Sequence, residues 1–449
     1  MNEVIVEKLM DFEGQGVPDA FARDLDLGPV AEPARGNLAT VVTGVRRCGK
    51  TFRLYQEMRR ILDAGVDPGR LMYFNFEDER LKPYAPSLLA EVLDTYYALH
   101  PDAKTEGAYL FLDEVQEVPE WGAFLRRVID SERATVYVTG SSSKMLSSSL
   151  ASEFRGRSLS RELFPMSLSE YARYHGVDAP GAGSPAGSAA RAGLRHALDG
   201  YLERGGFVAA QALPPADAVQ LLQEYAYRTV NLDVVERYGV RSPALAARFL
   251  SRCLASSGRE LSVNRVANAF KSAGLGASRE TLSSLLDYYE EAYLIFRLPE
   301  FSRSLSENPK SASKVYAVDP GMLVAFSPAP SVDVAQRLET AVFDKLRRDA
   351  GSLRAGALSR LLLTRSGQRA HEVDFVMGDP VVGEAWLLVQ ACASLADGGT
   401  RRRELAALRA GMAEFGVDEG WVVTLDESEE VDVPEGTVHV VPAWRWLLD

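Results

Sequence analysis

Residues 44–51 read Gly-Val-Arg-Arg-Cys-Gly-Lys-Thr and fit the pattern G-x-x-x-x-G-K-[ST] at every fixed position. In such a loop, backbone N–H groups surround a phosphate tail, and the positive end of the following helix faces the same anion. The apolar run at 38–42 before the loop is typical of a buried parallel strand, and apolar residues recur at helical spacing over 52–62. A strand, a phosphate-binding loop and a helix in this order predict an α/β nucleotide-binding sheet.

The loop predicts a set of nucleotide contacts. Lys50 is expected to reach the β- and γ-phosphates of ATP, and the Thr51 hydroxyl is expected to bind Mg²⁺. Arg46 or Arg47 could touch phosphate, but their interpretation as solvated arginines is equally good. The residues expected to bind the nucleotide are Gly44, Val45, Arg46, Arg47, Cys48, Gly49, Lys50, Thr51 and Phe52.

A second nucleotide signature is an apolar strand that ends in Asp113 and Glu114. A strand end beside the phosphate loop is where Mg²⁺ needs a carboxylate, so Asp113 is predicted to hold the metal through water. Glu114 is predicted to activate the attacking water as general base. The alternative is a strand end with two solvated acids. Asn75, Glu77 and Asp78 end another predicted strand and could position Glu114 or water.

Two further roles in hydrolysis are assigned with alternatives. The strand ending at Thr139 is expected to lie between the strand before the phosphate loop and the strand that ends at Asp113. Ser141 could therefore sense the γ-phosphate or orient water. It could instead cap a helix. An arginine in cis or from a neighbouring subunit would balance the transition-state charge. Arg157 is the first choice and Arg155 the second, against a solvated surface arginine.

Composition narrows the remaining classes of function. The net charge of −12 means that any nucleic-acid-binding patch must be local. Three scattered cysteines argue against a disulfide framework and favour a reducing cytoplasm. The first residues do not form a signal peptide, and no apolar run approaches the roughly 18 residues of a membrane helix, so no membrane partner is expected.

These motifs together resemble a family of prokaryotic AAA-superfamily ATPases. The resemblance rests on TGVRRCGKT, FLDEVQEVPEW, TGSSS, FRGRS and LFPMSLSEY, in that order, with YLERGGF, KVYAVDPGM and HEVDFV further along. It implies ATP binding and hydrolysis by an ATPase domain, followed by a helical region, a winged helix and a C-terminal restriction-endonuclease-like domain. The expected boundaries are a helical lead-in at 1–35, the ATPase domain at 36–175, a linker and helical region at 176–240, a winged-helix-like domain at 241–330 and a mixed α/β restriction-endonuclease-like domain at 331–449.

The middle of the chain has the pattern of a helix-turn-helix. Helices are predicted over 261–275 and 278–296, with a wing formed by 293–297 and 299–302. The second helix would present Arg279, Ser283 and Ser284 outward. A small excess of basic residues in this region supports DNA contact weakly, and packing against protein is an equally good interpretation.

For the C-terminal region the resemblance implies a restriction-endonuclease-like fold, and the residues of its site are expected to be degenerate. Restriction-type nucleases hold Mg²⁺ with an Asp on one strand and a Glu-x-Lys on the next. Glu372 and Asp374 supply the first strand, and Glu339 supplies a helical acid, but Gln390 and Cys392 stand where the Glu and Lys are needed. One carboxylate and the cation are therefore expected to be missing, which favours a fold kept for interaction or DNA docking.

The predicted function is ATP hydrolysis with Mg²⁺, coupling nucleotide state to the winged helix and the C-terminal domain, with DNA as a candidate partner. An arginine supplied by a second copy would require a homo-oligomer. The alternatives are a DNA-binding regulator or scaffold with slow ATP turnover and a metal-dependent nuclease. The sequence identifies no protein partner.

Overall fold

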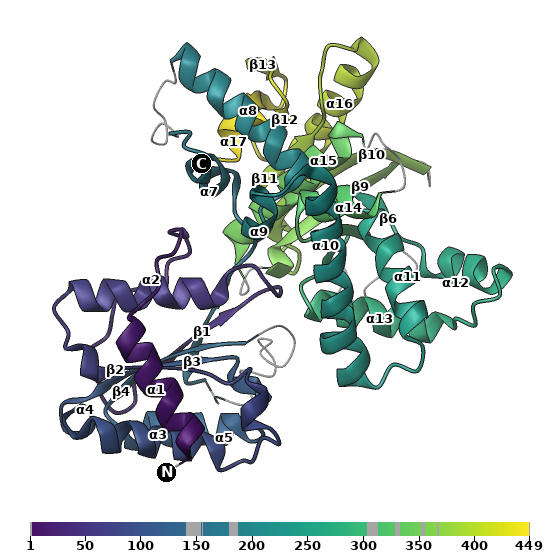
Figure 1. The fold of residues 1–449 in the computed structure, drawn as a ribbon. Helices are drawn as coiled ribbons and strands as arrows, with labels where there is room; N and C mark the ends of the chain where they lie inside the picture. Colours follow the sequence, from purple (N-terminus) through teal and green to yellow (C-terminus); the bar gives the residue numbers. More distant parts are fainter. Residues whose placement is uncertain are drawn as a thin grey trace. The chain divides into compact units, whose positions relative to one another are not determined.

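The chain divides into two units, Met1–Leu163 and Phe164–Asp449 (Figure 1). The computed structural model describes residues 2–140, 154, 156–178, 187–302, 313–327, 333–351, 355–365 and 368–448. Two residues with predicted roles in hydrolysis, Ser141 and Arg155, lie outside the described residues.

The sheet of the first unit has five parallel strands in the order β2-β3-β4-β1-β5. Every residue of β3 and β4 is buried, as is typical of parallel strands covered on both faces. The strand β4 lies between β3 and β1, which confirms the predicted order. The bounds are β1 Ala39–Thr43, β2 Leu71–Asn75, β3 Ala108–Asp113, β4 Ala134–Thr139 and β5 Ser158–Glu162.

Helices cover both faces of this sheet, as the sequence predicts (Figure 1). One face is covered by α2, which buries Leu54, Met58 and Ile61 at helical spacing. On the other face α1, α3 and α5 share one apolar core with alternate side chains of the strands. The bounds are α1 Glu3–Gln15, α2 Lys50–Asp63, α3 Leu88–Leu99, α4 Pro101–Glu106 and α5 Trp121–Ser131.

The prediction of a helical lead-in over 1–35 is wrong beyond residue 15. The helix α1 is capped by Gly16 with a φ of 70°, and no helix occurs over 17–35. Gly16 takes the left-handed φ that ends a helix, and Pro18 two residues later cannot continue one. The segment is therefore available for contacts with α2.

Helices make up much of the second unit. Among them the motifs YLERGGF and KVYAVDPGM are in contact. The buried Asp319 carboxylate accepts hydrogen bonds from Gly206 N at 2.5 Å and Gly321 N at 2.8 Å. A Cβ atom at Gly205 would lie 1.7 Å from Asp319 Oδ1, so only glycine fits there.

None of the described helices is long and apolar enough to span a bilayer. The bounds are α7 Leu168–Tyr174, α8 Ser188–Arg204, α9 Val208–Gln211, α10 Pro215–Thr229, the π-helix Val230–Glu236 and α14 Pro320–Phe326.

A small antiparallel sheet, in the order β6-β8-β7, accompanies three helices. Helix α13 begins at the N-cap Ser278, whose side chain accepts a hydrogen bond from Thr281 N. The predicted wing is wrong in its pairing, because β7 pairs with β8 and not with 299–302. Residues Pro299 and Phe301 instead exchange backbone hydrogen bonds with Arg360. The bounds are α11 Pro243–Leu254, β6 Arg259–Glu260, α12 Val263–Ser272, α13 Arg279–Glu291, β7 Ile295–Leu298 and β8 Lys314–Ala317.

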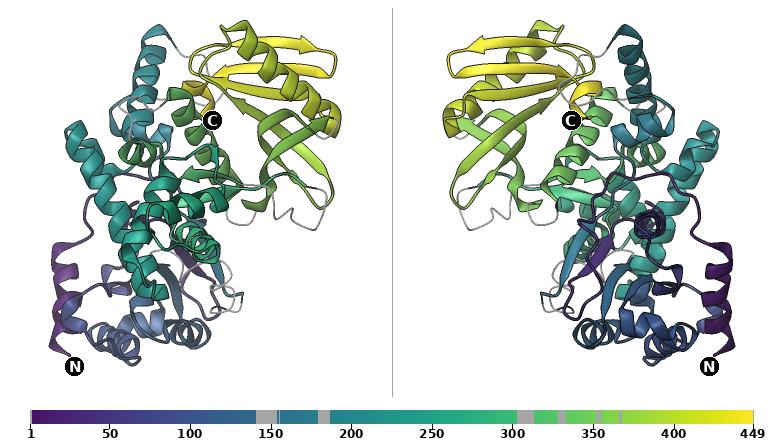
Figure 2. Two further views of the ribbon diagram at one scale, coloured as in Figure 1. Left: turned by 90° about the vertical axis from the view of Figure 1, so that its right-hand side faces the viewer. Right: turned by 90° about the vertical axis from the view of Figure 1, so that its left-hand side faces the viewer.

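The C-terminal part forms a mixed sheet of six strands in the order β13-β14-β12-β11-β10-β9. Helix α16 lies across one face (Figure 2), and its apolar side chains share a core with those of β10, β11, β12 and β14. The strand β13 is half-exposed and charged. The bounds are α15 Val334–Ala350, β9 Leu358–Arg365, β10 Gln368–Asp379, β11 Glu384–Ala391, α16 Gly398–Phe415, β12 Glu419–Thr424, β13 Glu429–Val433, β14 Gly436–Pro442 and α17 Ala443–Trp446.

Candidate nucleotide site

The phosphate loop connects β1 to α2 and has the backbone that its glycines predict. Gly44 has a φ of 145°, and a Cβ atom there would lie 2.0 Å from the Leu163 carbonyl oxygen. Gly49 has a φ of 105° and is the N-cap of α2. Both positions therefore need glycine, and the amino end of α2 opens directly onto the loop.

Lys50 is buried at the start of α2 and folds back across the loop. Its Nζ donates to the carbonyl oxygens of Gly44 at 3.1 Å and Val45 at 3.3 Å. An ammonium held there is close to the position where a phosphate tail would lie. Arg47 is exposed with a φ of 68°, and Phe52 is half-exposed, so both point away from the core.

The buried Asp113 carboxylate, at the end of β3, forms hydrogen bonds with Thr51 beside the phosphate loop and with residues of β2 and β4. Its Oδ2 accepts hydrogen bonds from the Thr51 hydroxyl at 2.7 Å, the Tyr73 hydroxyl at 2.9 Å and Asn75 Nδ2 at 3.0 Å. Its Oδ1 accepts a bond from the Thr139 hydroxyl. The two residues predicted to hold Mg²⁺, Thr51 and Asp113, are therefore in direct contact.

The oxygen atoms of this pair fit Mg²⁺, which prefers one or two carboxylates together with hydroxyl, water and phosphate oxygens. Burial, and secondarily the neighbouring Glu114, raises the pKa of Asp113 above its usual range, while the hydroxyl donors oppose that shift. A cation beside Asp113 would favour its ionised form.

Glu114 follows β3 in a left-handed conformation with a φ of 55°. Its backbone N donates to Thr139 Oγ1 at 3.1 Å, and its carboxylate accepts a hydrogen bond from Gln116 Nε2. Strained non-glycine backbone of this kind often occurs at functional sites. Glu114 thus lies at the carboxyl edge of the sheet, where β1 also delivers the phosphate loop.

Two other predicted positions differ from their expected roles. Arg157 lies at the amino end of β5, next to Ala39 at the start of β1, and forms an ion pair with Asp130. The length of β1, about 3.3 Å per residue, separates it from the phosphate loop of its own chain. A role in cis is therefore wrong, and a role in trans stays a prediction. Asp78 pairs with Lys8 rather than with groups near Glu114.

Two further residues, Tyr73 and Arg23, contribute to the site without belonging to any of its sequence motifs. Tyr73 lies within the apolar strand β2, yet its hydroxyl donates to Asp113. Arg23 lies before the predicted ATPase domain, yet its Nη1 donates to the Cys48 carbonyl oxygen within the loop at 2.7 Å. Burial raises the pKa of the Cys48 thiol, which makes it a poor nucleophile.

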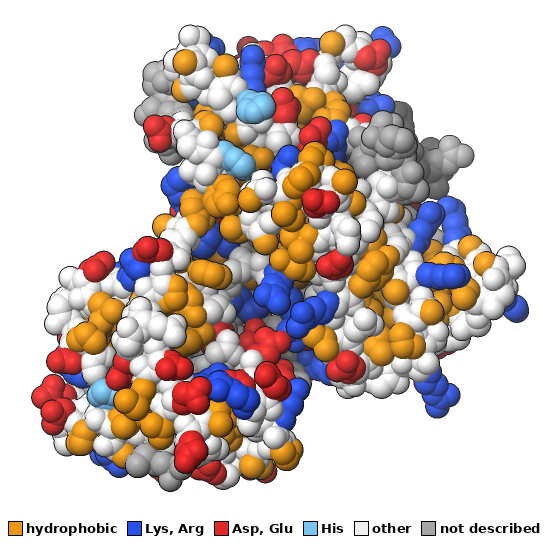
Figure 3. Space-filling view, in the orientation of Figure 1, with side chains coloured by type: hydrophobic (Ala, Val, Ile, Leu, Met, Phe, Trp, Pro, Cys, Tyr) orange, Lys and Arg blue, Asp and Glu red, His pale blue; other side chains and the backbone are white. Residues whose placement is uncertain are grey.

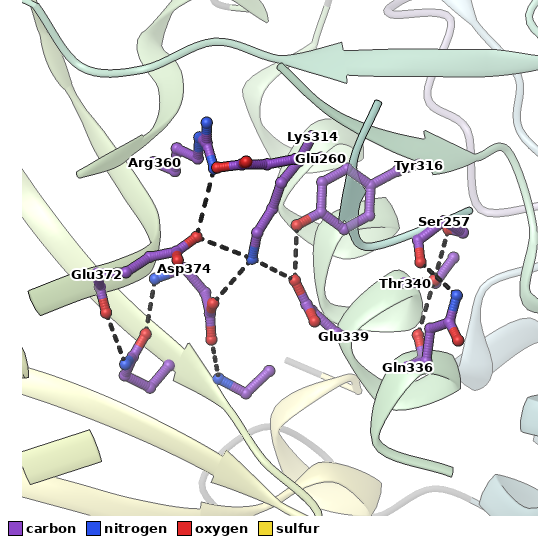
Figure 4. Close-up of polar contacts among 12 residues, drawn as sticks. Ser257, Glu260, Lys314, Tyr316, Gln336, Glu339, Thr340, Arg360, Glu372 and Asp374 are labelled. Atoms are coloured by element: carbon purple, nitrogen blue, oxygen red, sulfur yellow. Dashed lines mark hydrogen bonds and ion pairs between the residues drawn. The ribbon is translucent and has the colours of Figure 1, made fainter. Parts of the chain in front are cut away.

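The C-terminal acids also come together, but around a lysine (Figure 4). Lys314 Nζ lies 2.8 Å from Glu339 Oε1, 3.2 Å from Glu372 Oε1 and 3.1 Å from Asp374 Oδ1. The Tyr316 hydroxyl donates to Glu339 at 2.8 Å. The prediction that this centre lacks a cation is therefore wrong: β8 provides one, from a segment that the sequence assigned to another domain.

Gln390 and Cys392 occupy β11 and the residue just after it, and they serve the packing of this centre. Gln390 Oε1 accepts a hydrogen bond from Asp374 N at 2.6 Å, and Gln390 Nε2 donates to Glu404 Oε2 at 2.7 Å. Cys392 packs in the core beneath α16, and burial raises its pKa to about 12. Among the described residues, no group of three or more His, Cys, Asp or Glu has the geometry of a metal site.

The parallel sheet and the loop together define a P-loop nucleotide-binding fold. Residues 36–172 match the family described as AAA domain, and 195–333 match a domain of unknown function, DUF8612.

The chain is 30% identical over 419 residues to the uncharacterized protein MJ1544 of Methanocaldococcus jannaschii. The matched residues make up 92% of this chain and 88% of MJ1544. It therefore belongs to the same protein family as MJ1544. An uncharacterized protein of Haemophilus influenzae is 23% identical over 75% of this chain and 81% of its own length. Among solved structures, the Walker-type ATPase PABY2304 of Pyrococcus abyssi is 15% identical, with a TM-score of 0.37 over 64% of this chain and 90% of that one.

Proposed function

We propose that this protein hydrolyses ATP at the phosphate loop. The observation that carries the proposal is the 2.7 Å hydrogen bond between the Thr51 hydroxyl and the buried Asp113 carboxylate. The two residues expected to hold Mg²⁺ thus lie together at the edge of the sheet. Lys50 precedes Thr51 in the chain, and Glu114 follows Asp113.

Each residue then has a distinct task. The loop N–H groups and Lys50 bind the phosphates, and Thr51 and Asp113 would hold Mg²⁺, which neutralises phosphate charge when it is bound. Glu114 would accept a proton from the attacking water, since its carboxylate follows the metal-binding acid by one residue. Thr139 fixes both acids, because its hydroxyl contacts Asp113 and accepts a bond from Glu114 N.

An ATPase assay on the wild type and Lys50→Ala tests this proposal. We expect the variant to lose turnover by at least about 100-fold, because the removed ammonium faces the phosphates. Lys104→Ala is the matched control, since Lys104 is exposed on α4 of the same unit. Equal phosphate release by the wild type and Lys50→Ala would refute the proposal.

A second candidate function is DNA contact by the region of α12 and α13. Helix, strand, two helices and two strands follow one another here, which is the element order of a winged helix. Exposed Arg265, Lys271 and Arg279 lie on these helices, and Figure 3 displays lysine and arginine side chains around the same lobe. Such a basic rim would contact phosphates more than bases.

This second function is tested by the salt dependence of DNA binding. Removing the three basic side chains should lower affinity and reduce the slope of log K against log salt by about one unit for each lost phosphate contact. An unchanged slope would point to a protein partner for this lobe.

Gel filtration with and without ATP would detect the homo-oligomer that an arginine in trans requires.

A further inference from the structure

Residues 17–28, which follow α1, are hydrogen-bonded to α2, the helix that follows the phosphate loop. The backbone carbonyl groups of this segment are held by side chains from successive turns of that helix. The bonds are Arg53 Nε to Leu25 O at 2.9 Å, Gln56 Nε2 to Arg23 O at 3.0 Å, Arg59 Nη2 to Val17 O at 2.8 Å and Arg60 Nη2 to Gly28 O at 2.7 Å.

Arg23 is fixed at both its backbone and its side chain. Gln56 Oε1 accepts a hydrogen bond from Arg23 N at 2.9 Å, so the amide of Gln56 holds the Arg23 backbone on both sides. The residue is only 5% exposed, and its Nη1 donates to the Cys48 carbonyl oxygen at 2.7 Å. A Cβ atom on Gly49 would come within 3.3 Å of the same nitrogen.

This contact determines the direction of one peptide group in the phosphate loop. In a trans peptide the C=O and the following N–H point in opposite directions. Because Arg23 holds the Cys48 carbonyl oxygen on one side, the Gly49 N–H is directed to the other side. Gly49 has no Cβ and a φ of 105°, so sterics alone would allow this peptide other orientations.

We propose that Arg23 is a positioning residue of the nucleotide site: it orients the Cys48–Gly49 peptide so that Gly49 N–H faces the phosphate tail of a nucleoside triphosphate. The bond from a charged guanidinium is stronger than one between neutral groups, and its burial protects it from water. This inference rests on the proposed function, because it assigns a role at the same site.

The experiment measures the Kd of MgATP and MgADP by calorimetry for the full chain, together with kcat and KM for ATP. In Arg23→Gln we expect both Kd values and KM to rise about ten-fold, with kcat within about two-fold of the wild type. Arg23→Lys keeps the charge but not the planar fork, and should lie between. Arg59→Gln is the control, because it loosens the same segment away from the loop.

The outcomes separate this inference from the proposed function. If the wild type binds no ATP, the proposed function fails first. If the wild type binds ATP and Arg23→Gln binds it equally well, only the role of Arg23 is refuted. A purely structural role would lower the melting temperature of Arg23→Gln and Arg59→Gln alike while leaving both Kd values unchanged. If Arg23→Gln does not fold, the Kd of Arg23→Lys decides.

Discussion

Replacing Lys314 with methionine should destabilise the second unit strongly, and more so at high pH. The ammonium lies about 3 Å from each of three carboxylates. At an effective dielectric constant of about 20, each such contact is worth about 5 kcal/mol before desolvation. Breaking a buried ion pair by removing one partner costs about 3–5 kcal/mol net, because the remaining charge stays buried.

Protonation of Glu339 sets the pH dependence. Burial, and next Asp374, raises its pKa to about 7, while Lys314 opposes that shift. Because the folded pKa exceeds the usual value, this group stabilises the fold below about pH 4.5, and that stabilisation is lost as the pH rises through 7. Without Lys314 the folded pKa rises further, so the loss extends to higher pH. We expect a penalty of about 3 kcal/mol at pH 6 and about 5 kcal/mol at pH 8.5.

Urea unfolding of the full chain, followed by circular dichroism at both pH values, measures this penalty. Lys271→Met is the control, since that lysine is exposed on α12 and should change stability by less than about 0.5 kcal/mol. Adding Glu339→Gln to Lys314→Met should reduce the pH dependence. A penalty below about 1 kcal/mol, or one equal at both pH values, would refute the reasoning.

Three further predictions concern other parts of the chain. Glu114→Gln should bind MgATP as the wild type does but lower kcat by at least about 100-fold, as single-turnover assays would reveal; equal turnover contradicts its role as base. Removing Mg²⁺ with EDTA should abolish turnover while leaving the melting temperature of the nucleotide-free protein unchanged, and residual turnover would exclude the proposed metal dependence. Gly205→Ala should lower the melting temperature markedly or prevent folding, because its Cβ would lie 1.7 Å from Asp319 Oδ1; a wild-type melting curve would argue against that close contact.

The nucleotide site of the first unit was predictable because its constraints are local. The loop pattern specifies a strand, a turn and a helix within a few residues of one another, and the parallel sheet brings the ends of its strands to one edge. Thr51 and Asp113 could therefore be placed together although 62 residues separate them. For Arg157 only the role in cis is wrong, because the residue lies at the amino end of β5, at the opposite edge of the sheet from the phosphate loop.

The remaining contacts could not be predicted, since they join segments without a shared pattern. Lys314 is 25 residues from Glu339 and 60 from Asp374 in the chain, and a lone lysine at the start of a strand has no distinguishing signal. Tyr73 resembles any buried aromatic residue in an apolar strand. Arg23 lies in a segment that the sequence assigned to a helical lead-in, so only tertiary structure reveals its contact with the loop.

The hydrogen bonds between Pro299, Phe301 and Arg360 have a consequence for how this protein can be divided. They pair the backbone of Arg360 in β9, which is the outer strand of the six-stranded sheet. A fragment beginning at residue 331, where the sequence suggests a new domain, would leave that strand with unpaired backbone groups. Exposed strand edges recruit other chains, so such a fragment is expected to aggregate even if its own core forms.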